Sequence, residues 1–412
     1  MSASRAAPHS MPLQTRIQRA LTLAYTLVLA ALAALEPMVA AIFEINPVRQ
    51  CAMLVLLIFM TLIGYPRLLL TRETALYMFF TAYMFITLIW APSVDAGMNT
   101  LLPALCFILL SILFGALVAF YDLGGVFAGS LGGFVMGALL YTRVAGFPFV
   151  FPVGFSYNTF AGMYLFGLFI TLLFGWYTRL RLLPSVIALV IMVHIAATTS
   201  IKTNLGIVLG AGAAALMYAG SFMRVLRRNI VPLSILVTAL VFAVISNDAL
   251  FEQVQNGFDR VSHGVEILQR REDVVGNTSF GERADWQNLG VKGWVRSPLF
   301  GNGVEAFRAD IGITSHSTPI DLLYNTGLIG LVVFYVIFLS LGMRLAQARG
   351  SDLRSLPALI FAGLVCYGFI TLSGTMHYNS FMAIFFAVSA GLLWRLAGEP
   401  VRSPATAANT LL

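Results

Sequence analysis

The sequence predicts an all-α integral membrane protein with about twelve transmembrane helices and one long helical loop between the ninth and tenth. Apolar residues make up 59% of the 412 residues and charged residues only 10%, whereas a soluble domain has about 25% charged residues. The mean hydropathy is +0.86. The apolar residues form continuous runs rather than the alternating strands of an outer-membrane barrel, which indicates helices.

Apolar runs that can cross a bilayer recur along the whole chain. A span needs about 20 residues, and runs near this length occupy residues 20–35, 50–65, 75–91, 100–120, 123–142, 157–177, 184–200, 203–222, 229–246, 319–343, 355–374 and 378–394. Two divisions depend on single polar residues, Asp122 and Lys202. The predicted organisation is therefore nine spans in 1–246, a loop at 247–318, three spans in 319–396 and a tail at 397–412.

The distribution of positive charge predicts the topology. An even number of spans places both termini on one side, and if that side is the cytoplasm most arginines of the short connections lie inside. The short outer connections then hold only Arg49, Arg143 and Lys202, as the positive-inside rule requires. The formal charge of +7 is thus explained by topology and not by nucleic-acid binding. No small-residue cleavage site follows the first run, so it is expected to be an uncleaved anchor.

The loop at 247–318 is predicted to be a small helical cap on the outer membrane surface. From Leu250 to Leu268, apolar residues recur at spacings of three and four, which is typical of one face of a helix. A second helix is expected at 283–295, where Trp286 and Trp294 suit the membrane interface. The stretch "SPLFGNGVEAF" follows as a turn.

His316 has two interpretations. A histidine before an apolar helix is often an interfacial or helix-end residue. However, Ser315, Ser317 and Thr318 can cap the helix that Pro319 opens, and an imidazole can accept a hydroxyl proton near pH 7. Asp321 either orients the imidazole or favours the helix N-terminus. His377 is the rival candidate for the base, and His194 is expected to be a packed mid-span residue.

Four cations are candidates for an anion pocket. Lys202 and Arg143 lie near the outer interface, where they either extend along a helix end or line a pocket for a phosphate-bearing lipid. Arg283 and Arg260 can reach the same pocket from the cap, and guanidinium groups bind phosphate in bidentate fashion. For Arg260, as for the other loop cations, a solvated face is the alternative.

Several absences narrow the predicted chemistry. The sequence has no Walker-type nucleotide loop, no D-x-D pair of the kind used with sugar nucleotides, and no Cys/His cluster for zinc. Cys51, Cys106 and Cys366 each lie in an apolar run and are expected to be packing residues. A metal-free reaction without cofactors is therefore expected.

Three stretches together resemble the O-antigen ligase and polymerase superfamily of bacterial envelope glycosyltransferases. "SHSTPIDLLYNTGLIGLVVF" has the His316, Gly327 and Gly330 spacing, with Ser317 in place of the usual Asn. "RADWQNLGVKGWVRSPLFGNGVEAF" is similar to the cap segment of the family through Arg283, Trp286, Pro298, Gly301 and Gly303. "TRVAGFPFVFPVGFSYNTFAGMY" is a weaker match, and Lys202 stands where the family often has Arg.

The resemblance implies a metal-independent, inverting transfer in the outer leaflet of the inner membrane, facing the periplasm. Within the superfamily we favour the ligase reaction, in which O-antigen polysaccharide passes from undecaprenyl pyrophosphate to lipid A-core. His316 would be the base, and Arg283, Lys202, Arg143 and Arg260 would stabilise the pyrophosphate. Trp286, Ser317 and Asp321 would support them. The alternatives are an O-antigen polymerase, an O-linked protein oligosaccharyltransferase and, from another class, a flippase or transporter of lipid-linked glycans.

Overall fold

A computed structural model of the protein describes residues 13–43, 45–145, 157–178, 180, 182–197, 200–217, 279–348, 355–372, 374 and 379–398, and a few single positions between 234 and 259. Within these ranges every regular element is a helix. Eight helices are long and apolar enough to cross a membrane, and three shorter apolar helices accompany them. The chain is therefore an all-α membrane protein, as the sequence predicted.

The helices match the predicted spans closely. They are α1 (Leu13–Ile42), α2 (Pro47–Gly64), α3 (Arg72–Thr87) with the short η1 (Leu88–Trp90), α4 (Val94–Phe120), α5 (Leu123–Ala145), α6 (Tyr157–Thr178), α7 (Leu182–Ala197), α8 (Ile201–Met217), α13 (Thr318–Gln347), α14 (Ser355–Leu372) and α15 (Ser380–Gly398). The predicted ninth span, at 229–246, lies outside the described elements.

Both uncertain divisions between spans coincide with helix starts. The carboxylate of Asp122 accepts a hydrogen bond from Gly125 N at 2.7 Å and caps α5, which begins one residue later. At the second division, the carbonyl of Ser200 accepts from the amides of Thr203 and Asn204, each at 3.1 Å. Lys202 thus lies in the first turn of α8 and does not continue α7.

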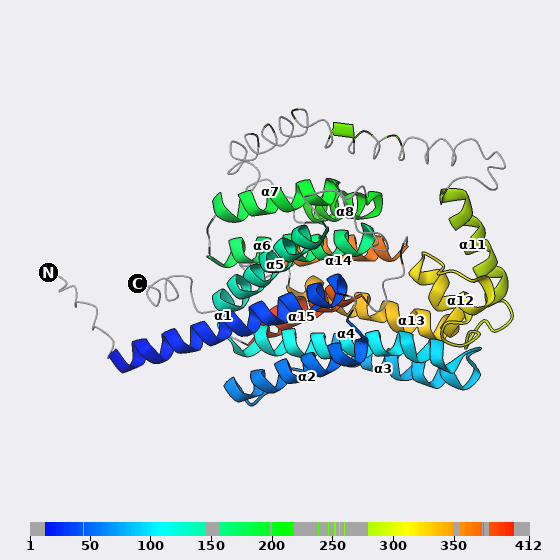
Figure 1. The fold of residues 1–412 in the computed structure, drawn as a ribbon, viewed down its shortest axis with the longest axis horizontal. Coiled ribbons are helices and arrows are strands. Elements are labelled where there is room, and N and C mark those ends of the chain that lie inside the picture. The colour runs from blue at the N-terminus through cyan, green and yellow to red at the C-terminus, as the bar shows by residue number, and fades with distance from the viewer. Residues whose placement is uncertain are drawn as a thin grey trace.

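The helices pack in long pairs around a shared apolar core. α1 lies along α5, α8 along α14, α4 between α15 and α2, α6 along α7, and α3 along α13 (Figure 1). α15 is central, because 72% of the residues in its apolar stretch are buried, whereas α2 is peripheral, with 17% of its apolar stretch buried. Apolar side chains such as Ile63 remain exposed on the outside of the bundle, where lipid would cover them.

Two helices form a cap at one end of the bundle. α11 (Ser279–Trp294) covers the predicted helix at 283–295, and α12 (Ala306–Ile311) follows the glycine-rich turn. Both pack against α13 and lie together at one end of the bundle in Figure 1. The predicted helix from Leu250 to Leu268 lies outside the described elements. We call α11, α12 and their connections through residue 317 the cap.

α13 is broken where the sequence predicted a continuous span. Gly327 has φ 67° and ψ −168°, which interrupts the helical hydrogen bonds. The segment 298–303 fills the break. The Tyr324 carbonyl accepts from Asn302 N at 2.8 Å, and the Leu328 amide donates to the Pro298 carbonyl at 2.9 Å. The hydroxyl of Tyr83 on α3 donates to the Thr326 carbonyl at 3.0 Å. The freed backbone groups are thus satisfied by protein, as an apolar environment requires.

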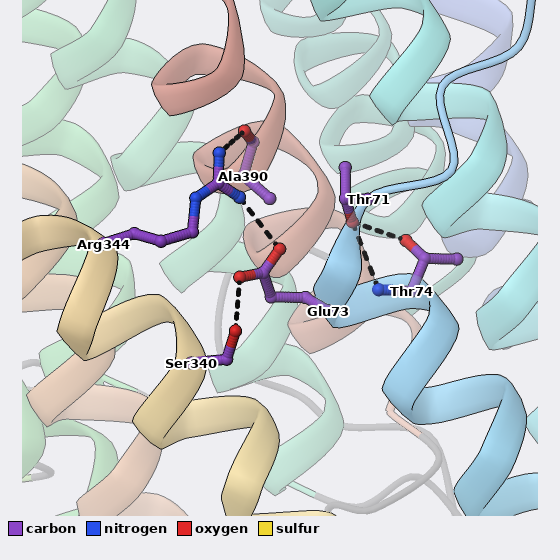
Figure 2. A network of polar contacts seen from close by, with 6 residues as sticks. All are labelled: Thr71, Glu73, Thr74, Ser340, Arg344 and Ala390. Atoms are coloured by element: carbon purple, nitrogen blue, oxygen red, sulfur yellow. Dashed lines mark hydrogen bonds and ion pairs between the residues drawn. The ribbon is translucent and has the colours of Figure 1, made fainter. Parts of the chain in front are cut away.

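Charged side chains brace the opposite end of the bundle. Arg344 of α13 forms an ion pair with Glu73 of α3 at 3.0 Å, and Ser340 donates to the other carboxylate oxygen of Glu73 at 2.9 Å (Figure 2). Arg344 also donates to the carbonyl of Ala390 on α15 at 3.1 Å. Arg395 donates to the Tyr121 carbonyl at the end of α4 at 2.7 Å. These arginines therefore tie helices together at the end remote from the cap.

Candidate functional site at the cap

His316 lies between the cap and α13 in an uncommon backbone conformation. Its φ is 53°, and within the described residues the only other non-glycine residue with positive φ is Glu305, at 63°. A side chain in the left-handed region costs about 1–2 kcal/mol, so surrounding contacts must hold it there. Such outliers concentrate at functional sites.

Ser315 supplies those contacts for His316. The Ser315 hydroxyl is fully buried and accepts from the Ser317 amide at 3.2 Å, while its proton reaches the Ser317 carbonyl at 2.8 Å. The same hydroxyl also lies 3.3 Å from the Asp321 carboxylate as a donor. Asp321 is 8% exposed and is therefore linked to His316 through the serine that closes the turn around it.

The helix start differs in detail from the predicted cap. Ser317 is the residue before α13, but its hydroxyl makes no capping hydrogen bond. The physical reason lies in Pro319, which occupies one of the positions where a capped amide is expected and has no N–H. The Thr318 hydroxyl and amide instead donate to the Gly374 carbonyl, at 2.5 Å and 3.1 Å.

An aromatic surface of the cap covers His316. The rings of Trp286 and His316 lie 5.4 Å apart, with their planes tilted by 30°. Trp286 also packs against a small buried cluster of Ala306, Phe307 and Tyr324. α11 therefore fixes one side of the imidazole, and the half-buried His316 is screened from solvent on that side.

Two of the predicted cations act on His316. Burial lowers the pKa of His316 below its ordinary value of 6.5, and the charges of Arg283 and then Lys202 lower this pKa further. Arg283 comes from α11 and Lys202 from α8, and both are half-buried. The ammonium of Lys202 lies against the backbone of Gly374, close enough that a methyl group at Gly374 would collide with it. Gly374 therefore links Lys202 to the first turn of α13.

The other predicted site residues are placed less fully. Arg143 is exposed in the last turn of α5, and the charges that lower the pKa of His316 come from Arg283 and Lys202. A role for Arg143 in the pocket stays a prediction. Arg260 and the rival base His377 lie outside the described residues, as does the side chain of His194. Among the described residues, no group of three or more His, Cys, Asp or Glu could hold a metal ion.

A pocket of about 410 Å³ lies between α4 and the cap. Its polar lining comes from Asn99 and Thr100 of α4 and from Glu305, Arg308 and Thr314 of the cap. Glu305 is hydrogen-bonded by the Thr100 hydroxyl. Thr314 lies two residues before His316, so the pocket and the imidazole share one short stretch of chain.

Three residues of this arrangement are not identified as site residues by the sequence alone. In the sequence, Ser315 is a helix-cap candidate, Glu305 is one of many acids in the loop, and Asn325 lies within an apolar span. The Asn325 backbone carbonyl accepts from Gly303 N at 2.9 Å, and its side-chain oxygen accepts from Phe307 N at 2.8 Å. Only a polar residue inside an otherwise apolar span, as in "LLYNTG", signalled its importance.

No protein-family model matches the chain, and no curated protein matches it.

Proposed function

We propose that the chain is a membrane glycosyltransferase that transfers a glycan from a polyprenyl pyrophosphate to a sugar hydroxyl without a metal ion. The single observation that supports this most is the environment of His316. Its imidazole lies beside the ring of Trp286, and its backbone has a left-handed conformation. Burial and the charges of Arg283 and Lys202 lower the pKa of the imidazole below 6.5. A neutral imidazole next to two cations suits a base that works beside an anionic leaving group.

The proposed reaction uses each of these groups once. His316 accepts the proton of the acceptor hydroxyl as that oxygen attacks the anomeric carbon of the donor. The bond between the anomeric carbon and the pyrophosphate oxygen breaks, and the electron pair leaves with undecaprenyl pyrophosphate. Arg283 and Lys202 stabilise the charge that develops on the pyrophosphate, and we assign the same role to Arg143 and Arg260. Attack opposite the leaving group inverts the anomeric configuration.

Within this class we propose the O-antigen ligase reaction. The donor is undecaprenyl-pyrophosphate-linked O-antigen, and the acceptor is the lipid A-core oligosaccharide. The site faces the periplasm from the outer leaflet of the bacterial inner membrane, and both termini lie in the cytoplasm. The placement of Arg344 and Arg395 at the end remote from His316 supports this orientation, because arginines favour the cytoplasmic side.

His316→Asn tests the proposed base. Asn tolerates the left-handed backbone but cannot accept a proton at neutral pH, so glycan transfer to lipid A-core should be abolished while the protein still folds. Lys292→Gln is the matched control, because Lys292 is an exposed cation on α11. Purified protein with both lipid substrates gives the measurement. Normal banded lipopolysaccharide from the His316→Asn variant would contradict the proposal.

The polymerase and the O-linked protein oligosaccharyltransferase share the donor and differ in the acceptor. A deletion strain separates the ligase from the polymerase. Loss of the ligase leaves long polymer on the lipid carrier, whereas loss of the polymerase leaves a single repeat unit on the core. Transfer to a protein acceptor in the purified system would identify the oligosaccharyltransferase.

One observation favours a transporter of lipid-linked glycans, namely the break in α13 at Gly327. Broken helices form the binding sites of many secondary transporters. In this chain, however, residues 298–303 and Tyr83 occupy the freed backbone groups, so the break joins the cap to the bundle. Lipid translocation in vesicles without any glycan transfer would favour the transporter.

A further inference from the structure

The pocket beside His316 has chemistry unlike that of the cationic site. Its polar groups are one carboxylate, one guanidinium, one amide and two hydroxyls, from Glu305, Arg308, Asn99, Thr100 and Thr314. Within the described part of the chain, Arg308 forms no ion pair, and the Glu305 carboxylate accepts a hydrogen bond only from the Thr100 hydroxyl. Mixed donors and acceptors of this kind match the hydroxyl groups of a sugar, and a volume of about 410 Å³ lies within the range of small-ligand sites.

Charge separates the pocket from the proposed pyrophosphate site. Arg283 and Lys202 act on His316 from α11 and α8, whereas the pocket lies between α4 and α12 and contains the Glu305 carboxylate. In the pocket the Glu305 carboxylate offsets the charge of Arg308, so a pyrophosphate would find no net positive charge there, whereas Arg283 and Lys202 supply it at His316. A neutral sugar needs no such charge and can donate hydroxyl protons to Glu305.

The backbone around Glu305 is held as firmly as that around His316. Glu305 has φ 63°, and Asn325 fixes both flanks through Gly303 N and Phe307 N. Asn325 lies one turn along α13 from Asp321, which is linked to His316 through Ser315. One short helical segment therefore fixes both the imidazole and the carboxylate. Thr314 of the pocket lies two residues before His316, so the pocket lining and the base belong to the same short stretch of chain.

We infer that this pocket is the subsite for the sugar that receives the glycan, with Glu305 accepting and Arg308 donating hydrogen bonds to its hydroxyl groups. The inference rests on the proposed function, because it assigns the acceptor side of that reaction. It also assigns a specificity role to Glu305, whose φ of 63° is a conformation that glycine adopts more readily.

Two variants of Glu305 separate recognition from folding. Glu305→Gln keeps the shape and removes the charge. Glu305→Gly suits the left-handed backbone and removes the carboxylate altogether, so a loss of function without a loss of thermal stability belongs to the carboxylate. Asp95→Asn is the control, because Asp95 is an exposed acid in the first turn of α4 that does not line the pocket.

Full-length protein in nanodiscs is assayed with the lipid-linked donor and with lipid A-core. Glu305→Gly should raise KM for lipid A-core about ten-fold or more, the loss expected for a hydrogen bond to a charged group, and Glu305→Gln less. KM for the donor and the rate of donor hydrolysis by water should change less than about two-fold. Asp95→Asn should match the wild type. An unchanged acceptor KM in an active Glu305→Gly variant, or a higher KM for the donor instead, overturns the inference.

Direct binding distinguishes failure of the inference from failure of the proposed function. Core oligosaccharide released from lipid A is titrated against wild type and Glu305→Gly, with saturation-transfer NMR as the readout. Glu305-dependent binding in a protein that transfers no glycan supports the subsite and contradicts the transferase. Transfer by the wild type with core binding that is indifferent to Glu305 contradicts the subsite alone. If the protein shows no glycan transfer and no core binding, both the subsite and the proposed function are contradicted.

Discussion

Gly301 and Gly327 lie against each other, and each has a left-handed backbone, with φ of 73° and 67°. A methyl group on Gly301 would come within 2.5 Å of Gly327 N, and one on Gly327 within 2.5 Å of Gly301 N. Gly301 lies in the cap and Gly327 in α13. Their contact is the joint between the cap and the bundle.

Gly327→Ala should therefore destabilise the protein far more than a strained backbone alone would. Gly312→Ala is the control, because Gly312 has φ 86° but open space around it. We expect Gly312→Ala to cost about 1 kcal/mol from conformational strain and Gly327→Ala at least about 2 kcal/mol more from backbone collision. Thermal unfolding in detergent measures the difference. Equal melting temperatures for the two variants would contradict the claim that the contact between Gly301 and Gly327 holds the cap against the bundle.

The pH dependence of transfer should report the cations around His316. The base must be neutral, and the pKa of His316 is lowered below 6.5 by burial, Arg283 and Lys202, so activity should fall only when the pH drops below 6.5. Lys202→Gln removes one positive charge, which raises the pKa of His316 and moves the acid limb to higher pH. The control Lys292→Gln should leave the limb in place. An acid limb of kcat/KM that stays fixed in Lys202→Gln would refute this coupling.

Ser315→Ala should reduce kcat through the position of the imidazole. The substitution removes the hydroxyl that binds both backbone groups of Ser317 and the Asp321 carboxylate. Loss of a buried hydrogen bond costs about 1–3 kcal/mol, which corresponds to a fall of roughly ten-fold or more in rate if it appears in the transition state. Ser315→Thr should restore part of the rate, because it keeps the hydroxyl. A variant with normal kcat and a lower melting temperature would show a purely structural role.

The Glu73–Arg344 pair should stabilise the end of the bundle remote from the cap. Glu73 is almost fully buried, with its side chain 1% exposed, so Arg344→Met leaves a buried charge with Ser340 as its remaining partner in Figure 2. We expect a cost of about 3 kcal/mol, since breaking a buried pair is strongly destabilising. The double variant Glu73→Gln/Arg344→Met should recover part of it. Arg67→Met, at an exposed position, is the control in the same thermal assay, and additive costs in the double variant would argue against the pair.

Hydropathy was sufficient for the spans, because continuous apolar runs leave few alternatives in a bilayer. It placed eleven spans that the structure describes as helices, and it located the polar divisions at Asp122 and Lys202. The break in α13 could not be foreseen in this way, because "TGLIG" keeps the run apolar. The left-handed backbone of Gly327 becomes evident only in the folded protein, where residues 298–303 lie beside it.

The candidate site divides along the same line. His316 and Arg283 can be singled out from the sequence because their residue types carry chemistry wherever they stand near a membrane surface. Glu305 and Ser315 cannot, since their contacts with α4 and α13 are not encoded in any local pattern. Ser317 occupies the predicted capping position, but its hydroxyl makes no capping hydrogen bond, because Pro319 has no N–H to donate.

Residues 304–317 have both ends fastened to one helix, through Gly303 and Asn325 at one end and through the start of α13 at the other. This stretch carries Glu305, Arg308, Thr314 and His316, and its buried residues Val304, Ala306 and Phe307 pack it into the protein. If the pocket binds the acceptor sugar as inferred, acceptor preference can diverge by substitution of Glu305, Arg308 and Thr314 while His316 and both anchors stay fixed. Chains with this bundle are then expected to differ most at these three pocket positions and least at His316 and at the anchors.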